Sequence, residues 1–86
     1  MEDDENLSNM ELTILEIITQ QRDIHIPVIM GQVQSMFTAT GQPFDKALFR
    51  GSLLRLEKLG LIEKRKYPNS SMETAVVTEK GRALID

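Results

Sequence analysis

The sequence predicts a small α+β domain, mostly helical, in which three helices precede a β-hairpin and a short final helix. Three observations near the C-terminus carry this prediction. A helical pattern ends at Gly60, where a residue without Cβ adopts a left-handed conformation at least cost. Two runs with strand character, residues 61–67 and 72–78, flank a cluster of turn formers. Thr78 has the position of an N-cap, which restarts a helix.

Length and composition fit one domain. The chain has 86 residues and 41% apolar content, which supports a single core and leaves no room for a second domain. It contains no cysteine, which excludes a disulfide framework and thiolate chemistry. No apolar run approaches the ~18 residues of a membrane span, and the acidic start is unlike a targeting segment. We therefore expect a soluble cytoplasmic protein with no membrane partner.

The first helix is predicted from its start signal and its apolar spacing. Residues 1–6 are charged and lack apolar periodicity, so we expect a disordered acidic tail before a domain over residues 7–86. Ser8 and Glu11 have the spacing of a capping box. Leu12 falls outside the apolar stripe and is predicted to be exposed, with a subunit contact as the alternative. The stripe itself recurs at three- and four-residue steps and consists of Met10, Ile14, Ile17 and Ile18, with Leu7 and Leu15 beside it.

A short segment and a second helix follow. Residues 22–26 are predicted to be a linker or a one-rung strand, and Pro27 fits the first turn of a helix that runs to about Thr38. Residues 38–43 are rich in turn formers and break this helix. Its predicted buried side consists of Ile29, Met30, Val33, Met36 and Phe37.

The third helix begins near Asp45, a good N-cap, and continues to Leu59. Its predicted core side is Leu48, Phe49, Ser52, Leu53, Leu56 and Leu59. The opposite side carries four bases around Gly51. A glycine inside a helix costs up to ~1 kcal/mol, so it indicates a close neighbour, either DNA backbone or another helix. A three-helix core with a C-terminal hairpin wing and a short final helix is the arrangement of a winged helix-turn-helix.

Charge is divided unevenly along the chain. The formal net charge is −3, but residues 1–43 carry one base against seven acids, a net charge of −6. Residues 44–86 carry nine bases against six acids, a net charge of +3. The basic half therefore coincides with the predicted third helix and hairpin, which favours a nucleic-acid partner for that half.

The same region resembles a known family. LLRLEKLGLIEKR, followed by a hairpin and by TEKGRALI, resembles the winged-helix transcriptional regulators of the MarR and PadR type. These typically show a leucine-rich recognition helix ending in Leu-Glu-x-x-Gly-Leu-Ile and a Thr-x-x-Gly-Arg after the wing. The likeness covers roughly residues 8–86. It implies sequence-specific binding of double-stranded DNA and a role in transcription regulation, with the third helix in the major groove and the wing on the backbone.

The resemblance also assigns expected roles to the basic residues. Lys46 and Arg50, near the start of the third helix, are expected nearest the base edges, and the arginine fork is the better candidate for reading guanine. Five further bases of this half are expected to neutralise phosphates: Arg55, Lys58, Lys64, Arg65 and Lys66.

Two features leave alternatives open. The wing tip, residues 68–71, carries no base, and the total charge is acidic, so a winged-helix protein–protein interaction module without DNA binding is the alternative function. The chain ends at Asp86, before the long terminal helix through which members of those families usually dimerise. The sequence is therefore compatible with a monomer that reads one half-site and with an isologous homodimer formed through the first helix.

Catalytic and cofactor-binding patterns are weak in this sequence. His25 is the single histidine and lies between Ile24 and Ile26, so we expect a structural or surface role. The five glycines are scattered and form no phosphate-binding loop. We therefore predict no enzyme activity, no metal and no cofactor.

Overall fold

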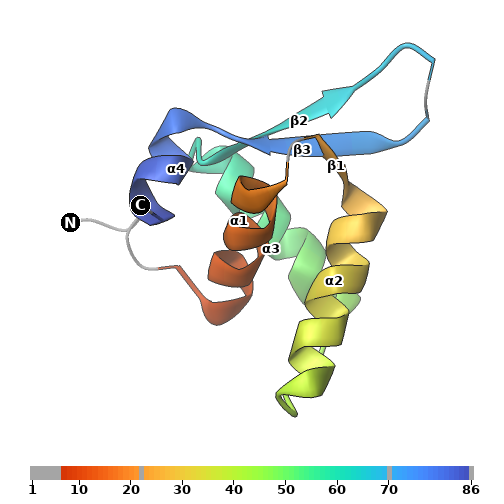
Figure 1. Cartoon of the computed structure of the whole chain (residues 1–86), viewed down its shortest axis with the longest axis vertical. Coiled ribbons are helices and arrows are strands. Elements are labelled where there is room, and N and C mark those ends of the chain that lie inside the picture. The colour runs from red at the N-terminus through yellow and green to blue at the C-terminus, as the bar shows by residue number, and fades with distance from the viewer. Residues whose placement is uncertain (1–6, 22, 70, 86) are drawn as a thin grey trace.

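Three helices lie against one side of a small antiparallel sheet in the computed structural model, and the β-hairpin projects beyond them (Figure 1). The structure describes residues 7–21, 23–69 and 71–85, so the predicted disordered tail, residues 1–6, lies outside the described residues. The elements in chain order are α1 (Asn9–Gln20), β1 (Ile24–His25), α2 (Ile26–Ala39), α3 (Lys46–Lys58), β2 (Ile62–Lys66), β3 (Glu73–Val77) and α4 (Glu79–Ile85).

The predicted capping box starts α1. The Ser8 hydroxyl accepts a hydrogen bond from the Glu11 N–H at 3.1 Å, and the Glu11 carboxylate accepts one from the Ser8 N–H at 2.8 Å. Leu12 is exposed, as predicted. The predicted stripe is confirmed, because the apolar residues of α1 that are buried in the core are Met10, Ile14, Leu15, Ile17 and Ile18.

The one-rung strand is the alternative that forms before α2. Ile24 and His25 pair with β3, and α2 then begins at Ile26 with Pro27 in its first turn. The prediction that Met36 is buried is wrong, because its side chain is 47% exposed. The buried residues of α2 follow one row at four-residue steps, Ile29, Val33 and Phe37. Consecutive side chains of a helix point about 100° apart. Phe37 points into the core, so the Met36 side chain beside it points about 100° away from the core.

A turn containing Phe44 connects α2 to α3. The Phe44 ring packs against Phe37 of α2 and Phe49 of α3, with ring centroids 6.3 and 6.2 Å apart respectively. The predicted N-cap is confirmed, since the Asp45 carboxylate accepts a hydrogen bond from the Ala47 N–H at 2.8 Å. These contacts fix the start of α3 relative to α2.

The buried side of α3 is narrower than the sequence predicts. Phe49, Ser52, Leu53 and Leu56 are buried, whereas Leu48, predicted to be in the core, is 55% exposed. Leu48 lies roughly 80° around the helix from Leu56. The helix is therefore buried along a narrow arc, and Leu48 falls outside it.

The hairpin and α4 are joined to the end of α3 by local hydrogen bonds. Gly60 adopts a left-handed conformation with φ of 78°, as predicted. Strand order in the sheet is β1-β3-β2, so β3 lies in the middle. The Thr78 hydroxyl accepts from the Gly81 N–H at 3.1 Å and donates to the Gly60 carbonyl at 2.6 Å. A Cβ on Gly81 would overlap the Leu61 carbonyl oxygen, which explains why a glycine stands in the first turn of α4.

Candidate nucleic-acid interface

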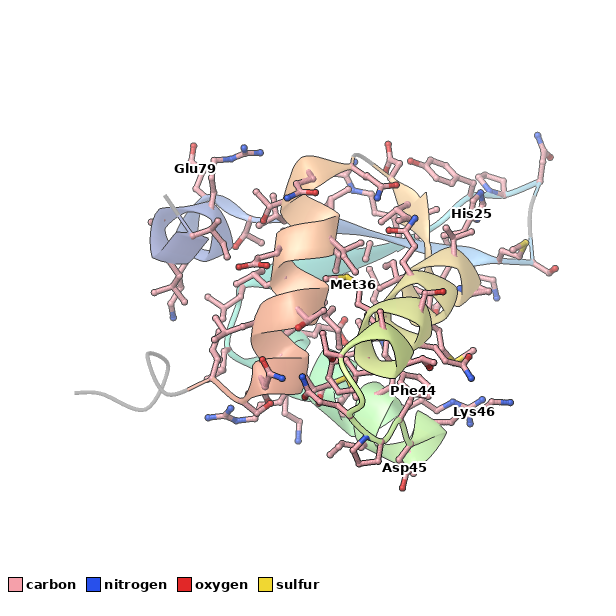
Figure 2. All side chains as sticks on the ribbon, turned by 60° about the horizontal axis from the view of Figure 1, so that its bottom comes forward. His25, Met36, Phe44, Asp45, Lys46 and Glu79 are labelled. Carbon is pink, nitrogen blue, oxygen red and sulfur yellow. The ribbon has the colours of Figure 1, made fainter. Side chains whose placement is uncertain are left out.

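The exposed side of α3 carries a row of bases. Lys46, Arg50 and Lys58 follow one four-residue row with Leu54 between the last two, and all of these residues are exposed. We call Lys46, Arg50 and Lys58 the cationic row. Figure 2 shows Lys46 at the start of α3, pointing away from the body of the molecule. Among the described residues, no acidic side chain pairs with any base of this row. Three uncompensated positive charges are therefore presented to solvent.

Small and apolar residues lie next to this row. Ala47, Leu48, Gly51 and Leu54 are exposed on α3, and the two leucine side chains are 55% and 48% exposed. We call these four residues the apolar patch. A Cβ on Gly51 would meet none of the described atoms within 4 Å. The close neighbour predicted from the sequence for this glycine is therefore not a helix within the described part of the chain.

Strand β2 brings two further bases toward α3. The Lys64 ammonium lies 3.6 Å from the Glu57 carboxylate of α3. Side chains alternate along a strand, so Lys64 and Lys66 lie on the sheet face of the buried Ile62. Lys66 is exposed, and the structure gives it no ion pair with a described residue. These two lysines extend the charged surface of α3 toward the hairpin.

Arg55 has an intramolecular partner. Its Nη1 lies 2.6 Å from Oε1 of Glu11, whose side chain is only 5% exposed. That same carboxylate oxygen accepts the hydrogen bond from the Ser8 N–H. A buried carboxylate requires a charged or hydrogen-bonded partner, and Arg55 supplies it. Arg55 therefore joins α3 to the first turn of α1. The sequence pattern predicts only a capping role for Glu11, because its burial depends on contacts with residues far along the chain.

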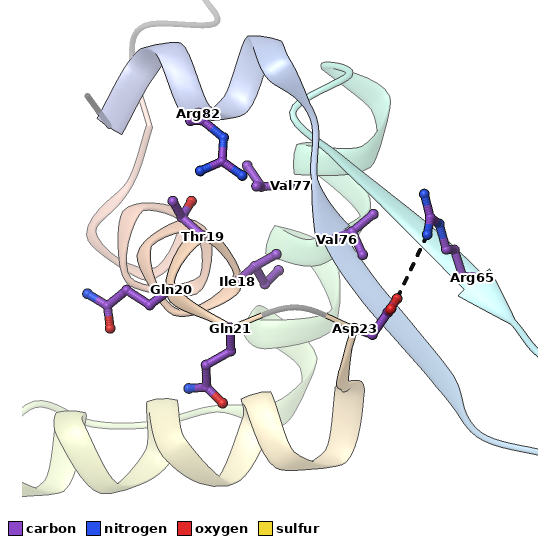
Figure 3. Close-up of a pocket in the computed structure, with 9 residues that line it drawn as sticks. All are labelled: Ile18, Thr19, Gln20, Gln21, Asp23, Arg65, Val76, Val77 and Arg82. Atoms are coloured by element: carbon purple, nitrogen blue, oxygen red, sulfur yellow. Dashed lines mark ion pairs between the residues drawn. The ribbon is translucent and has the colours of Figure 1, made fainter.

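Arg65 points to the other face of the sheet. Its guanidinium lies 3.9 Å from the Asp23 carboxylate (Figure 3). Both residues line a cavity of about 500 Å³ between the end of α1, the sheet and α4, together with Ile18, Thr19, Gln20, Gln21, Val76, Val77 and Arg82. Of the seven predicted contact residues, Lys46, Arg50, Lys58, Lys64 and Lys66 are thus grouped around α3. Arg55 also belongs to α3 but is paired with Glu11, and Arg65 lies on the other face of the sheet.

Neither a metal-binding cluster nor a membrane-spanning helix is found among the described residues. No group of three or more histidine and acidic side chains within them is arranged to hold a metal ion. His25 is half-buried, and its Nδ1 atom has no hydrogen-bond partner. Within the same described ranges, no helix has both the length and the apolar character required to cross a membrane.

Comparison with solved structures shows a likeness to a known fold. No family model matches the sequence, and no curated protein matches it. The crystal structure of MarR superimposes with a TM-score of 0.70 and 24% sequence identity, covering 95% of this chain and 54% of that chain. The chain thus spans about half the length of that protein. Its fold is a mostly helical α+β winged helix-turn-helix similar to that of MarR, in which α2 and α3 are the helix-turn-helix and β2 and β3 form the wing.

Proposed function

We propose that the protein binds double-stranded DNA sequence-specifically and regulates transcription, with α3 in the major groove and the wing along the backbone. The observation that carries this proposal is the cationic row on the exposed side of α3, which has no acidic partner among the described residues. The MarR-like fold supports it, because α3 has the place of a recognition helix in a helix-turn-helix.

The dimensions of α3 suit the groove. Its 13 residues make a helix about 20 Å long and 10–12 Å wide, and a B-DNA major groove is about 12 Å wide. Recognition helices contact base edges with their N-terminal residues. We therefore assign Lys46 and Arg50 to base contacts. Arg50 is the stronger determinant of specificity, because its guanidinium can donate to both N7 and O6 of a guanine.

We assign phosphate contacts to the bases that lie beyond the N-terminal part of α3. Lys58 lies at the C-terminal end of α3, and Lys64 and Lys66 follow on β2. The Lys64–Glu57 pair is long and partly exposed, so it is weak enough for a phosphate to replace the carboxylate. We assign Arg55 to the support of the interface, because it pairs with the buried Glu11 carboxylate. We leave Arg65 out of the phosphate contacts, because it lies on the other face of the sheet beside Asp23.

A salt titration of binding to duplex DNA tests the proposal. Neutralising three to five phosphates predicts a slope between about −3 and −4.5 in log K against log salt. A slope of about −3 is expected when only Lys58, Lys64 and Lys66 contact phosphates. A slope of about −4.5 is expected when Lys46 and Arg50 also contact phosphates. A duplex that contains the selected site should bind more tightly than a scrambled duplex at the same salt concentration.

A protein–protein interaction module is the second candidate function. The exposed leucines of the apolar patch favour it, as do the net charge of −3 and a wing tip without bases. Such a module predicts no duplex binding even at low salt, or binding that does not depend on salt. Either result in the titration would replace the DNA-binding proposal with this alternative.

A further inference from the structure

The apolar patch is the feature of α3 that the cationic row does not explain. Leu48, Gly51 and Leu54 follow one another at three-residue steps, so they form a continuous ridge on the helix surface. Ala47 lies one turn before Gly51 and widens that ridge. Single exposed leucines are ordinary. Here, four small or apolar residues adjoin one another outside the buried arc of α3, with Leu48 beside that arc and Ala47, Gly51 and Leu54 opposite it, which indicates a binding surface.

The charges around the patch indicate what occupies it. Lys46, Arg50 and Lys58 run along one border of the patch, and the single acid of α3, Glu57, pairs with Lys64. A partner that covers the apolar patch should therefore carry negative charge where it meets the cationic row and be apolar where it meets the two leucines. A DNA major groove has this character, because phosphates line its edges and the C5-methyl group of thymine is the apolar group on its floor.

We propose, on the basis of the DNA-binding function above, that Leu48 and Leu54 contact thymine methyl groups and so set an A·T preference within the site. Gly51 lies between the two leucines with open space above it, which lets the helix backbone approach the bases. Leu48 and Leu54 are separated by about 9 Å along the helix axis. Because the two leucines lie at different heights on the helix, they contact different base pairs of the site.

The test uses duplexes that the 86-residue chain selects from random DNA. Each thymine of the selected site is replaced in turn by deoxyuridine, which keeps the O4 acceptor and lacks the methyl group. Loss of one methyl contact should weaken binding about fourfold, the ratio that corresponds to ~0.8 kcal/mol per buried methyl. Replacing thymines outside the site should leave the affinity unchanged, as a control on the DNA.

Protein variants connect the effect to particular side chains. Leu54→Ala should abolish the response to deoxyuridine at one position and keep it at the other, and Leu48→Ala should do the converse. Met36→Ala removes a similarly exposed apolar side chain from α2 and should preserve both responses. Thermal unfolding of each variant shows that it remains folded.

The outcomes separate this inference from the proposed function. Tight, salt-dependent duplex binding with equal affinity for thymine and deoxyuridine would overturn the inference and leave DNA binding intact. Absence of duplex binding at low salt would overturn both. Self-association that is lost in Leu48→Ala and Leu54→Ala would then assign the patch to a second copy of the chain.

Discussion

The guanidinium of Arg55 and the carboxylate of Glu11 form a 2.6 Å ion pair that joins α3 to the first turn of α1. The acid is buried, whereas the arginine side chain is 41% exposed. The capping box adds a hydrogen bond from Ser8 to the same oxygen. One carboxylate thus starts α1 and also orients α3.

Arg55→Ala should destabilise the fold by about 1–3 kcal/mol, because it leaves the Glu11 carboxylate buried without its charged partner. The matched control is Arg65→Ala, which breaks the more exposed 3.9 Å pair with Asp23 and should cost less than ~1 kcal/mol. Urea unfolding of both variants measures the difference. Equal losses of stability would show that the burial of Glu11 has no energetic consequence.

Arg50→Ala should reduce affinity for a cognate duplex by about 1–3 kcal/mol and relax base preference at one position. Lys66→Ala should weaken binding to all duplexes about equally and reduce the salt slope by about one, because a phosphate contact carries no direct sequence information. Competition binding against a panel of single-base variants checks both expectations. Uniform losses from both substitutions would refute this division of roles.

The features that could be predicted from the sequence are those set by neighbouring residues. The cap residues Ser8, Asp45 and Thr78 were identified, because each bonds to a backbone group two or three positions away. The left-handed Gly60 was identified for the same reason. The order of helices and strands follows from such local signals, so the fold was accessible from the sequence alone.

Features that depend on distant residues were not accessible in this way. Leu48 and Met36 were assigned to the core because periodicity indicates a side of a helix, whereas the width of the buried arc depends on what packs there. The partner of Arg55 is 44 residues away in the chain. Arg65 likewise faces away from α3 because β2 pairs with β3 in one particular register. The sequence therefore predicts that bases gather on α3 and β2. It does not predict that Arg65 lies on the face of the sheet that points away from α3.

Thr74→Val should leave stability unchanged or raise it by about 1 kcal/mol. Thr74 is 2% exposed, and its hydroxyl has no hydrogen-bond partner among the described residues, so the substitution removes an unsatisfied polar group and preserves the shape of the side chain. The control is Thr78→Val, in which the same chemical change removes the N-cap of α4 and should cost about 1 kcal/mol. Thermal unfolding measures both. A large loss from Thr74→Val would reveal a hydrogen bond of this hydroxyl in solution.

Gly51→Ala should raise stability and lower DNA affinity at the same time. A Cβ at Gly51 meets no described atom, and alanine is favoured over glycine in a helix interior by up to ~1 kcal/mol, so unfolding should shift to higher temperature. The same methyl group would stand between the helix and the bases that it approaches, so affinity for a selected duplex should fall. Gly31→Ala is the matched control, since Gly31 is also an exposed glycine inside a helix, in α2, with no described atom within 4 Å of its added Cβ. It should raise stability by a similar amount and leave DNA affinity unchanged. If both alanine variants bind DNA as the unmodified chain does, the exposed side of α3 makes no close approach to the duplex.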